Sequence, residues 1–401
     1  MTSPSRTNSA NAPVCDVDFY SDATIADPIA AYHRMLALGP MVWLETNSIL
    51  AICGFAELTQ SLRNHQVFQS GMGVSINEEI NKFVIGSTLN SDPPRHDATR
   101  SITFSPLTPK ALVAVRERLE READFIVDKL LAQDQFDAAA ELAPHLPLTI
   151  VRDLVGLGDH GGANMLKWGA ATFELMGDPR ERRDAALNNL KQMRTFLESP
   201  ETLDSLPEDG WASRATKKAM EAGMPHDEAS ELMRDYIPPS LDTTISAIGY
   251  GMMLFAQNPD QWEMIRQDPS MIRNAIEEIV RLNTPIRAFT RVTSEPIEVG
   301  GLSIERNSRV MMVFGAANRD ATRFPEPDRF DITRSNVRGH VGFGHGVHAC
   351  LGMHLARLEM TCLFEALARR VKRFELVGPV VPSINASIHS MARVPLKAVL
   401  A

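Results

Sequence analysis

Residues 343–352 read Phe-Gly-His-Gly-Val-His-Ala-Cys-Leu-Gly, and a strongly helical run begins at Leu351. The glycines allow the backbone to turn tightly beneath a flat ligand, because glycine tolerates positive φ and close approach. A helix that starts just after Cys350 directs its unpaired N–H groups and the positive end of its dipole at the sulfur. Both lower the pKa of a thiol and stabilise its anion. The loop therefore predicts a thiolate that can bind a metal.

Two other interpretations of Cys350 stay open on this loop alone. A cysteine in a glycine-rich turn can be a small, buried and inert residue of the core. Zinc is the other alternative, because nitrogen and sulfur ligands lie close together at His345, His348, Cys350 and His354. Their spacing differs from that of the paired ligands in structural zinc sites, which argues against zinc.

The composition is that of a globular protein in a reducing compartment. The 401 residues are 44% hydrophobic and 23% charged, and the net charge of −9 argues against general nucleic-acid binding. The four cysteines lie far apart or at helical spacing, without a disulfide framework. No apolar run is long enough for a signal peptide or a bilayer span. We therefore expect a cytoplasmic protein that binds neither nucleic acid nor membranes.

Hydrophobic periodicity predicts a mostly α protein with small β-sheets. We expect helices at 112–130, 139–156, 184–198, 228–256, 260–283 and 351–373, a β-hairpin at 41–53, and further strands at 286–313 and 374–399. Residues 1–13 are expected to form a flexible N-terminal tail, because they are rich in small polar residues and proline. No linker interrupts residues 14–401, which are predicted to be a single large helical domain with a β-rich N-terminal portion.

The loop around Cys350 resembles the haem-binding signature of the cytochrome P450 family, in which the cysteine thiolate is the axial ligand of the haem iron. The resemblance covers nearly the whole chain, from His96 to the C-terminal strands, with the motifs in family order. It implies the cytochrome P450 fold and one haem b (iron protoporphyrin IX), with Cys350 as ligand of the iron. It also implies a monooxygenase that inserts one oxygen atom from O2 into a small organic substrate.

Further segments match the family's donors to the haem propionates. In Asp92-Pro-Pro-Arg-His-Asp-Ala-Thr-Arg100, His96 and Arg100 are four residues apart and share a helix face. By resemblance, these two side chains hold the propionates together with Arg291 and His348, because carboxylates require cationic or N–H donors. Taken alone, His96 and Arg100 would be surface residues.

A structural ion cluster is implied by a second motif. Glu278 and Arg281 are three residues apart on a predicted helix, so their side chains share a face. An exposed pair of this kind contributes about 0.5 kcal/mol or less. By resemblance, Arg329 in Phe324-Pro-Glu-Pro-Asp-Arg-Phe330 is the third partner, and the buried cluster braces the loop under the haem.

The tetrad Leu241-Asp-Thr-Thr244 lies within the predicted helix 228–256 and has two interpretations. An Asp-Thr pair is unfavourable in a helix interior, and proline belongs in a first turn, so Pro238 and Pro239 indicate a helix start with Asp242 as its cap. By resemblance, Asp242 and Thr243 are instead the catalytic acid–alcohol pair of the helix that crosses the haem. There the hydroxyl supports dioxygen and the acid relays protons. The family has Ala-Gly where this chain has Pro239-Ser240, so we expect proline to kink the helix here.

The resemblance also implies redox partners. A chain without a fused flavin or iron–sulfur module receives electrons from a [2Fe–2S] ferredoxin and an NAD(P)H-dependent ferredoxin reductase. A candidate docking face for the ferredoxin consists of Arg116, Arg118, Arg338 and Arg357. Each of these arginines, taken singly, is typical of a solvated surface charge.

Residues 284–291 and 339–348 resemble bacterial members that O-demethylate para-substituted methoxybenzoates. Ser240 and Phe289 are candidate pocket residues by the same analogy. Those members bind the substrate carboxylate with basic or hydroxyl residues of the loop that matches Ser70–Leu89, where this chain offers Asn77, Glu78, Glu79, Asn81 and Lys82. We therefore expect hydroxylation or O-demethylation of a small neutral methoxy-aromatic such as an alkylguaiacol. The alternatives are hydroxylation of a terpenoid or other apolar molecule and, in another class, a non-catalytic haem-binding sensor.

Overall fold

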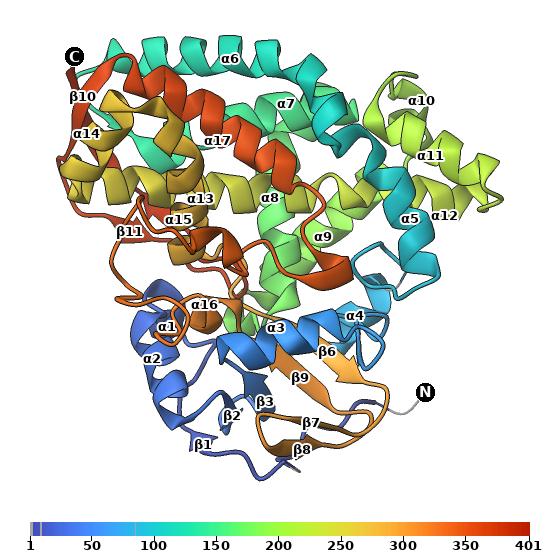
Figure 1. The fold of residues 1–401 in the computed structure, drawn as a ribbon. Helices are drawn as coiled ribbons and strands as arrows, with labels where there is room; N and C mark the ends of the chain where they lie inside the picture. Colours follow the sequence, from blue (N-terminus) through green and yellow to red (C-terminus); the bar gives the residue numbers. More distant parts are fainter. Residues whose placement is uncertain (1–2, 9, 85) are drawn as a thin grey trace.

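Helices make up the larger part of the molecule, and a six-stranded sheet lies at the end that contains the N-terminus (Figure 1). The computed structural model describes residues 3–8, 10–84 and 86–401. The helices are α1 Asp22–Ala26, α2 Ile29–Leu38, α3 Phe55–Arg63, α4 Glu78–Val84, α5 Arg95–Thr103, α6 Pro109–Leu131, α7 His145–Val155, α8 Gly158–Met176, α9 Arg183–Leu197, α10 Pro200–Ser205, α11 Trp211–Glu221, α12 His226–Glu231, α13 Pro238–Gln257, α14 Pro259–Gln267, α15 Ile272–Asn283, α16 Phe314–Ala317 and α17 Met353–Ala368.

The strands form one large sheet and three small ones. They are β1 Val14–Cys15, β2 Met41–Leu44, β3 Ile49–Ile52, β4 Phe68–Gln69, β5 Phe136–Asp137, β6 Phe289–Thr293, β7 Ile297–Val299, β8 Leu302–Ile304, β9 Arg309–Met312, β10 Val371–Leu376, β11 Val381–Pro382, β12 Met391–Arg393 and β13 Pro395–Leu400. The large sheet has the order β1-β2-β3-β9-β6-β4. The predicted hairpin at 41–53 is confirmed, with β2 antiparallel to β3 and Leu44 opposite Ile49. The β-rich portion is thus completed by β6 and β9, which come from far along the chain.

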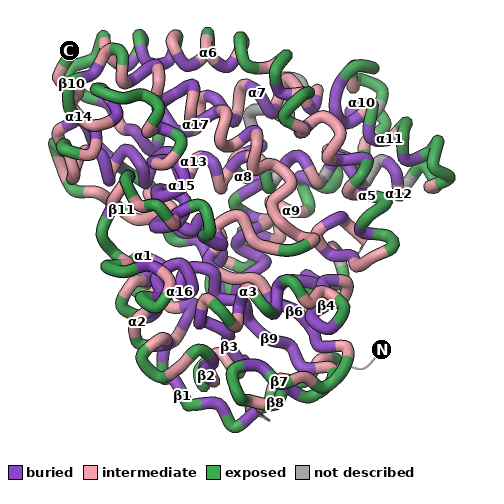
Figure 2. Tube along the Cα trace, in the orientation of Figure 1, coloured by how far each residue is buried: buried purple, intermediate pink, exposed green. Residues whose placement is uncertain are grey.

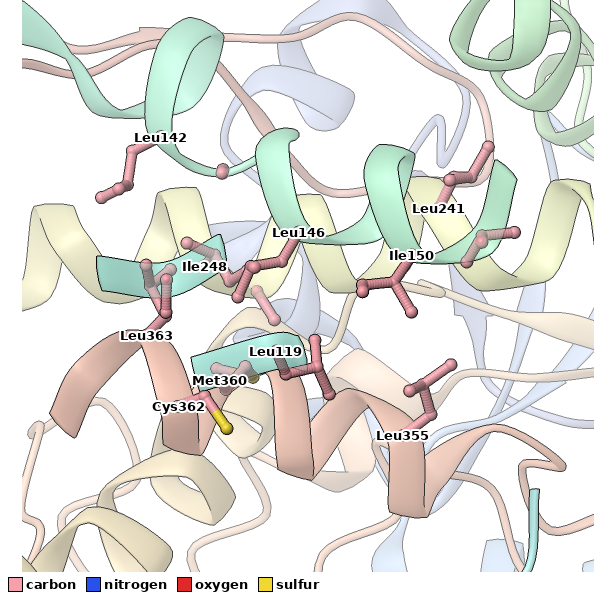
Figure 3. Packing of buried hydrophobic residues seen from close by; sticks show 14 of the residues in the cluster. Leu119, Leu142, Leu146, Ile150, Leu241, Ile248, Leu355, Met360, Cys362 and Leu363 are labelled. Carbon is pink, nitrogen blue, oxygen red and sulfur yellow. The ribbon is translucent and has the colours of Figure 1, made fainter. Parts of the chain in front are cut away.

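The main core lies where α17 packs against α6 and where α13 packs against α7, α8 and α17. Figure 3 shows Leu119, Leu146, Ile248 and Leu363 among the residues of this cluster, and each is fully buried. Figure 2 shows the same burial along α13, α15 and α17, while the outer turns of α6 and α11 are exposed. Each helix presents one apolar face inward at a period near 3.6 residues, as the sequence predicts. This core fixes α13 and α17, the two helices on which much of the site depends.

Two of the predicted helices are broken. The expected helix 228–256 ends with α12 and resumes with α13 at Pro238, because two prolines occupy the first turn of α13 and cannot donate backbone hydrogen bonds to a preceding turn. The expected helix 260–283 is divided into α14 and α15 by a short turn at Pro269–Met271. The prediction of a kinked but continuous helix at Pro239 is therefore wrong.

The described residues of the expected flexible tail at 1–13 make contacts with the rest of the protein and with one another. Ser5 pairs with Ser308 as a parallel bridge, and the backbone N–H of Arg309 donates to the Ser5 carbonyl at 3.0 Å. The side chain of Asn8 closes a turn with Ala12 through two hydrogen bonds of 3.0 and 2.9 Å. Within the described part of the chain, no helix is long and apolar enough to span a membrane.

Candidate active site

Cys350 lies at the end of a tight loop that leads into α17. Its backbone N–H donates to the Phe343 carbonyl at 2.8 Å, which closes the loop. Gly344 and Gly346 have φ values of 68° and 70°, a region that non-glycine residues rarely adopt. A Cβ atom at Gly346 would lie 2.4 Å from the Leu62 carbonyl oxygen, so glycine is also required by close approach to α3. The glycine pattern thus shapes the loop as predicted, although α17 begins at Met353 and not at Leu351.

The electrostatics of the Cys350 thiol differ from the sequence-based expectation. Burial raises its pKa, while the backbone N–H groups of Gly352 and Met353 and the nearby Arg100 act in the opposite direction. The helix terminus acts on the sulfur as predicted, but desolvation of the anion outweighs it. A metal cation bound to the sulfur would supply the counter-charge that stabilises a thiolate at this position.

The zinc alternative receives no support. Among the described residues, no group of three or more His, Cys, Asp or Glu side chains is placed to hold a metal ion. His345, one of the proposed ligands, instead accepts a hydrogen bond from Arg63 Nε at 2.7 Å.

A large cavity, mostly apolar, opens beside Cys350. Its volume is about 420 Å³. Residues expected at the cofactor line one part of it, and these are Arg100, Arg291, His348 and Cys350. The expected pocket residues Ser240, Thr243 and Phe289 line it as well. The cavity therefore brings together residues from α5, α13, β6 and the cysteine loop.

The four expected propionate donors converge near this cavity. The rings of His96 and His348 lie 4.4 Å apart, and their Nε2 atoms are buried with no hydrogen-bond partner. Arg100 donates to the Ala349 carbonyl at 2.7 Å, and Arg291 donates to the Thr290 carbonyl at 2.8 Å. Their hydrogen-bond partners are therefore neutral carbonyls in the described part of the chain.

The donors concentrate positive charge in a buried place. Burial lowers the pKa of Arg291 to about 10. Burial, with the charges of Arg291 and Arg100 and neighbouring His96, lowers the pKa of His348 to about 2. The guanidinium groups of buried Arg291 and half-buried Arg100 bond only neutral carbonyls in the described part of the chain, and they favour an anionic ligand because a desolvated charge is costly without a counter-charge. His96 is 1% exposed, so the surface position expected from its residue type alone is excluded.

Asp242 and Thr243 lie in the second turn of α13. Asp242 Oδ2 is buried without a hydrogen-bond partner, and burial raises the pKa of this carboxyl to about 7. A Cβ at Gly169 of α8 would lie 2.5 Å from the same oxygen. Thr243 Oγ1 donates to the Pro239 carbonyl at 3.1 Å. The helix does start at Pro238, but Asp242 is not its cap, because Ile237 occupies that position.

The Glu278 cluster has a different third member from the one predicted. Arg281 donates to both carboxylate oxygens of Glu278 at 2.7 Å, and both side chains are fully buried. Arg334 supplies the third charge, with Nε 3.2 Å from Glu278 Oε1. The prediction of Arg329 is wrong.

The local geometry of the turn explains why Arg334, and not Arg329, is the third member of the cluster. The side chain of Arg329 is 57% exposed and pairs with Glu326 at 3.0 Å on the surface. Its backbone carbonyl, not its guanidinium, faces inward and accepts from Arg281 and Arg334. Arg334 bonds the carbonyls of Pro325, Glu326 and Arg329, so it fills the turn that the prolines create.

Comparisons with known proteins decide the family. The family model described as Cytochrome P450 matches residues 181–391. Cytochrome p450 CYP199A2 of Rhodopseudomonas palustris is 32% identical over 401 residues, which cover 99% of this chain and 97% of that protein. The chain belongs to the cytochrome P450 family. It is a P450 monooxygenase by family, and haem is the cofactor of that family.

Other relatives agree with this assignment. Linalool 8-monooxygenase of Pseudomonas putida is 30% identical over 296 residues, covering 72% of this chain and 71% of that enzyme. The structure of CYP268A2 from Mycobacterium marinum in complex with pseudoionone matches with a TM-score of 0.84 and 26% identity, covering 96% of this chain and 99% of that one. The predicted P450 fold is therefore confirmed.

The residues of this P450 fit its cofactor. Haem b carries two propionates and an iron that accepts a thiolate. The chain supplies the half-buried thiol of Cys350 beside two guanidinium groups that have no carboxylate bond among the described residues. The Nε2 atoms of His96 and His348 have no hydrogen-bond partner among the described residues, so two further nitrogen atoms are available to bond the same ligand. The donor set is therefore that of a buried, dianionic, iron-containing ligand.

Three residues at the cavity were not anticipated from the sequence. Glu359 on α17 lines the cavity with both carboxylate oxygens buried and without a hydrogen-bond partner, and burial raises its pKa to about 8. A signal was available, because Leu355, Glu359 and Cys362 step by four and three along one helix face. Arg95 and Glu228 form an ion pair of 2.9 Å in the cavity wall between α5 and α12, which no local pattern indicates.

Proposed function

We propose that this P450 binds haem b through Cys350 and holds the two propionates with His96, Arg100, Arg291 and His348. The observation that carries the proposal is the group of cationic and nitrogen donors that converge at one cavity beside the half-buried thiol of Cys350. When bound, the haem supplies activation of O2 for transfer of one oxygen atom to a substrate. The protein's own residues then bind and orient the substrate, exclude water and deliver protons.

Asp242 and Thr243 are proposed to deliver protons. A carboxyl with a pKa near 7 can both give and take a proton at neutral pH, which is the requirement for a relay. Thr243 lines the cavity next to Asp242, and its hydroxyl is held by the Pro239 carbonyl. Such a pair favours an oxygenase over a haem-binding sensor, since a sensor needs no proton delivery.

The Glu278–Arg281–Arg334 cluster is proposed to brace the segment 318–334. Its hydrogen bonds reach the carbonyls of Asn318 and Pro327, and the backbone N–H of Val341 donates to Asn318 Oδ1 at 2.8 Å. Because Val341 directly precedes the cysteine loop, the cluster orients that loop without touching a ligand.

The substrate is proposed to be a small neutral methoxy-aromatic, such as an alkylguaiacol, that is hydroxylated or O-demethylated. Phe289 and Arg291 are two residues apart on β6, so their side chains lie on the same face of the strand, the face toward the cavity. Phe289 therefore places an aromatic edge beside the proposed haem and can pack against a small ring. Leu89, Phe173 and Met176 add apolar walls.

A neutral substrate fits the loop Ser70–Leu89. Its described residues that line the cavity are Val84, Gly86, Ser87, Thr88 and Leu89, and none carries a charge. Lys82 is exposed, and Asn81 is engaged in two hydrogen bonds with the backbone of Ser75. A substrate carboxylate would find no cationic partner on this loop.

A terpenoid is the second candidate. It is favoured by two of the relatives, since one is named linalool 8-monooxygenase and another was solved with pseudoionone. Both compounds are small, branched and apolar, and the cavity beside Phe289 offers them the same apolar walls.

Electrons are proposed to come from a [2Fe–2S] ferredoxin with its NAD(P)H-dependent reductase. Of the four arginines expected to dock it, Arg338 is exposed, with no ion pair found in the described chain. Arg357 is engaged, because it bonds Glu277 at 2.7 and 2.9 Å. Arg116 and Arg118 are paired with Glu120 and Asp153. Arg338 is therefore the best single site at which to test docking by charge reversal.

The test of substrate class is an optical titration of the holoenzyme. A panel of alkylguaiacols, methoxybenzoates and monoterpene alcohols is scored by the shift of the haem spin state. We expect tight responses to neutral methoxy-aromatics and weak ones to the benzoates. Phe289→Leu should weaken the aromatic responses at least tenfold, whereas Phe364→Leu, which removes a ring from the core, should not. A tight response to a terpenoid with none to methoxy-aromatics overturns the choice.

Turnover distinguishes an enzyme from a sensor. Reduced ferredoxin and reductase are supplied with the best ligand from the panel, and NAD(P)H consumption is compared with product. Product formed in proportion to NAD(P)H consumed supports a monooxygenase. Ligand-induced spectral change without any product supports a sensor.

A further inference from the structure

The N-terminal segment Ser3–Asn8 lies beside the start of β9, which is an interior strand of the large sheet. Ser5 N–H donates to the Asn307 carbonyl at 2.7 Å, and Asn307 Nδ2 donates to the Ser3 carbonyl at 3.3 Å. With the bridge between Ser5 and Ser308, these bonds hold the segment beside the start of β9. Figure 1 shows the N-terminus on the side of the molecule where β6 and α4 also lie.

From this position Arg6 reaches the loop that precedes α4. Its guanidinium donates to the Ile76 carbonyl and lies 3.8 Å from Glu78 Oε1. Arg309 of β9 holds the same carboxylate from inside, with bonds of 2.7 and 3.0 Å to Glu78, and bonds the Gly73 carbonyl at 2.8 Å. Glu78 thus lies between two arginines, of which Arg309 is fully buried and Arg6 is 29% exposed.

The same loop supports the wall of the cavity. Val74 N–H donates to Asn90 Oδ1 at 3.1 Å, and the Val74 carbonyl accepts from Thr290 N–H at 2.7 Å, next to Phe289. The Val74 side chain packs in one apolar cluster with Phe173, Met176, Leu89 and Phe289. Asn90 and these four packing partners all line the cavity. Movement of residues 72–78 would therefore move the cavity wall.

We propose that Arg6 is a positioning residue for the substrate pocket, and that residues 3–8 form a strap across the loop 72–78. Arg309 is buried and anchors the two ends of the loop, through the Met72 and Gly73 carbonyls and the Glu78 carboxylate. Arg6 is partly exposed and bonds the Ile76 carbonyl between these anchors, so its contacts exchange with water and release this middle part of the loop at small cost. The strap slows substrate exchange without taking part in chemistry. This inference rests on the proposed function only in that the cavity receives the substrate.

The test measures ligand exchange in the holoenzyme. Stopped-flow absorbance follows dissociation of 4-phenylimidazole, a haem ligand whose phenyl ring occupies the pocket. We expect Arg6→Ala and a variant lacking residues 1–8 to raise the dissociation rate about three- to tenfold, with the Soret band and the haem content unchanged. Arg6→Lys should restore most of the slow rate, because it keeps a cationic donor. Arg34→Ala, which removes another N-terminal arginine paired with Asp16 at 2.6 Å, is the matched control.

Hydrogen exchange supplies a second readout. The amides of residues 72–78 should exchange faster in Arg6→Ala than in wild type, and those of α13 should not. Unchanged dissociation rates in both variants, or equal acceleration in Arg34→Ala, would overturn the strap. If 4-phenylimidazole fails to bind wild-type holoenzyme, the proposed haem pocket fails instead. If Arg6→Ala loses haem, the dissociation rate of the variant lacking residues 1–8 decides, and no change from wild type in that variant rejects the proposal.

Discussion

We expect Arg334, and not Arg329, to stabilise the Glu278 cluster. Alanine substitutions at the two positions distinguish their contributions to the free energy of unfolding. Arg334→Ala removes a partner from a fully buried carboxylate and also leaves the carbonyls of Pro325 and Glu326 without this donor. Loss of one partner of a buried ion pair costs about 3–5 kcal/mol. Because Arg281 keeps both bonds to Glu278, we expect the lower end, about 3 kcal/mol.

Arg329→Ala should have a much smaller effect. Its guanidinium is exposed and pairs with Glu326 on the surface, and exposed pairs contribute about 0–1 kcal/mol. Its inward-facing carbonyl, which accepts from Arg281 and Arg334, is retained in alanine. The two substitutions should therefore differ by about 2 kcal/mol or more in free energy of unfolding.

The assay is guanidinium unfolding of both holoenzymes, followed by far-ultraviolet circular dichroism and by the Soret band. Arg334→Lys should fall between wild type and alanine, because lysine keeps the charge but cannot reach three carbonyls in the same geometry. The reasoning is refuted if Arg329→Ala destabilises as much as Arg334→Ala. It is also refuted if Arg334→Ala lies within about 0.5 kcal/mol of wild type.

Three further outcomes are expected. Because burial raises the pKa of Asp242 from 3.8 to about 7, the native state holds this proton more tightly than the unfolded chain, and stability falls as pH rises through that range. Asp242→Asn should flatten this part of the pH–stability profile, and an unchanged slope would contradict the assignment. Thr243→Ala should release more hydrogen peroxide per product in coupled turnover, whereas unchanged coupling would reject its role. Arg95→Ala should make ligand association faster and less dependent on salt in stopped-flow measurements, because the ion pair of Arg95 with Glu228 joins two elements of the cavity wall. A salt dependence equal to that of wild type would exclude a role of this ion pair in ligand entry.

Local patterns in the sequence determined the parts of the site that short-range geometry controls. The glycines around Cys350 and the three-residue spacing of Glu278 and Arg281 each place groups by backbone conformation alone, and the structure reproduces them. The same holds for the hairpin at 41–53, whose register is set by its own turn. The prediction that His96 and Arg291 converge near one cavity came from the family resemblance and not from hydrophobic periodicity.

Tertiary structure decided what depends on contacts between distant segments. Arg329 and Arg334 look equivalent in the sequence, and only the path of the turn directs one outward and the other to Glu278. The tail is polar and proline-rich, yet Arg6 contacts a carbonyl and a carboxylate of the loop at 72–78. The thiol pKa of Cys350 depends on burial, which no local pattern gives. The sequence alone thus determined the cofactor chemistry, while packing decided the charge partners and the pocket wall, because buried electrostatic energies depend on the whole surroundings.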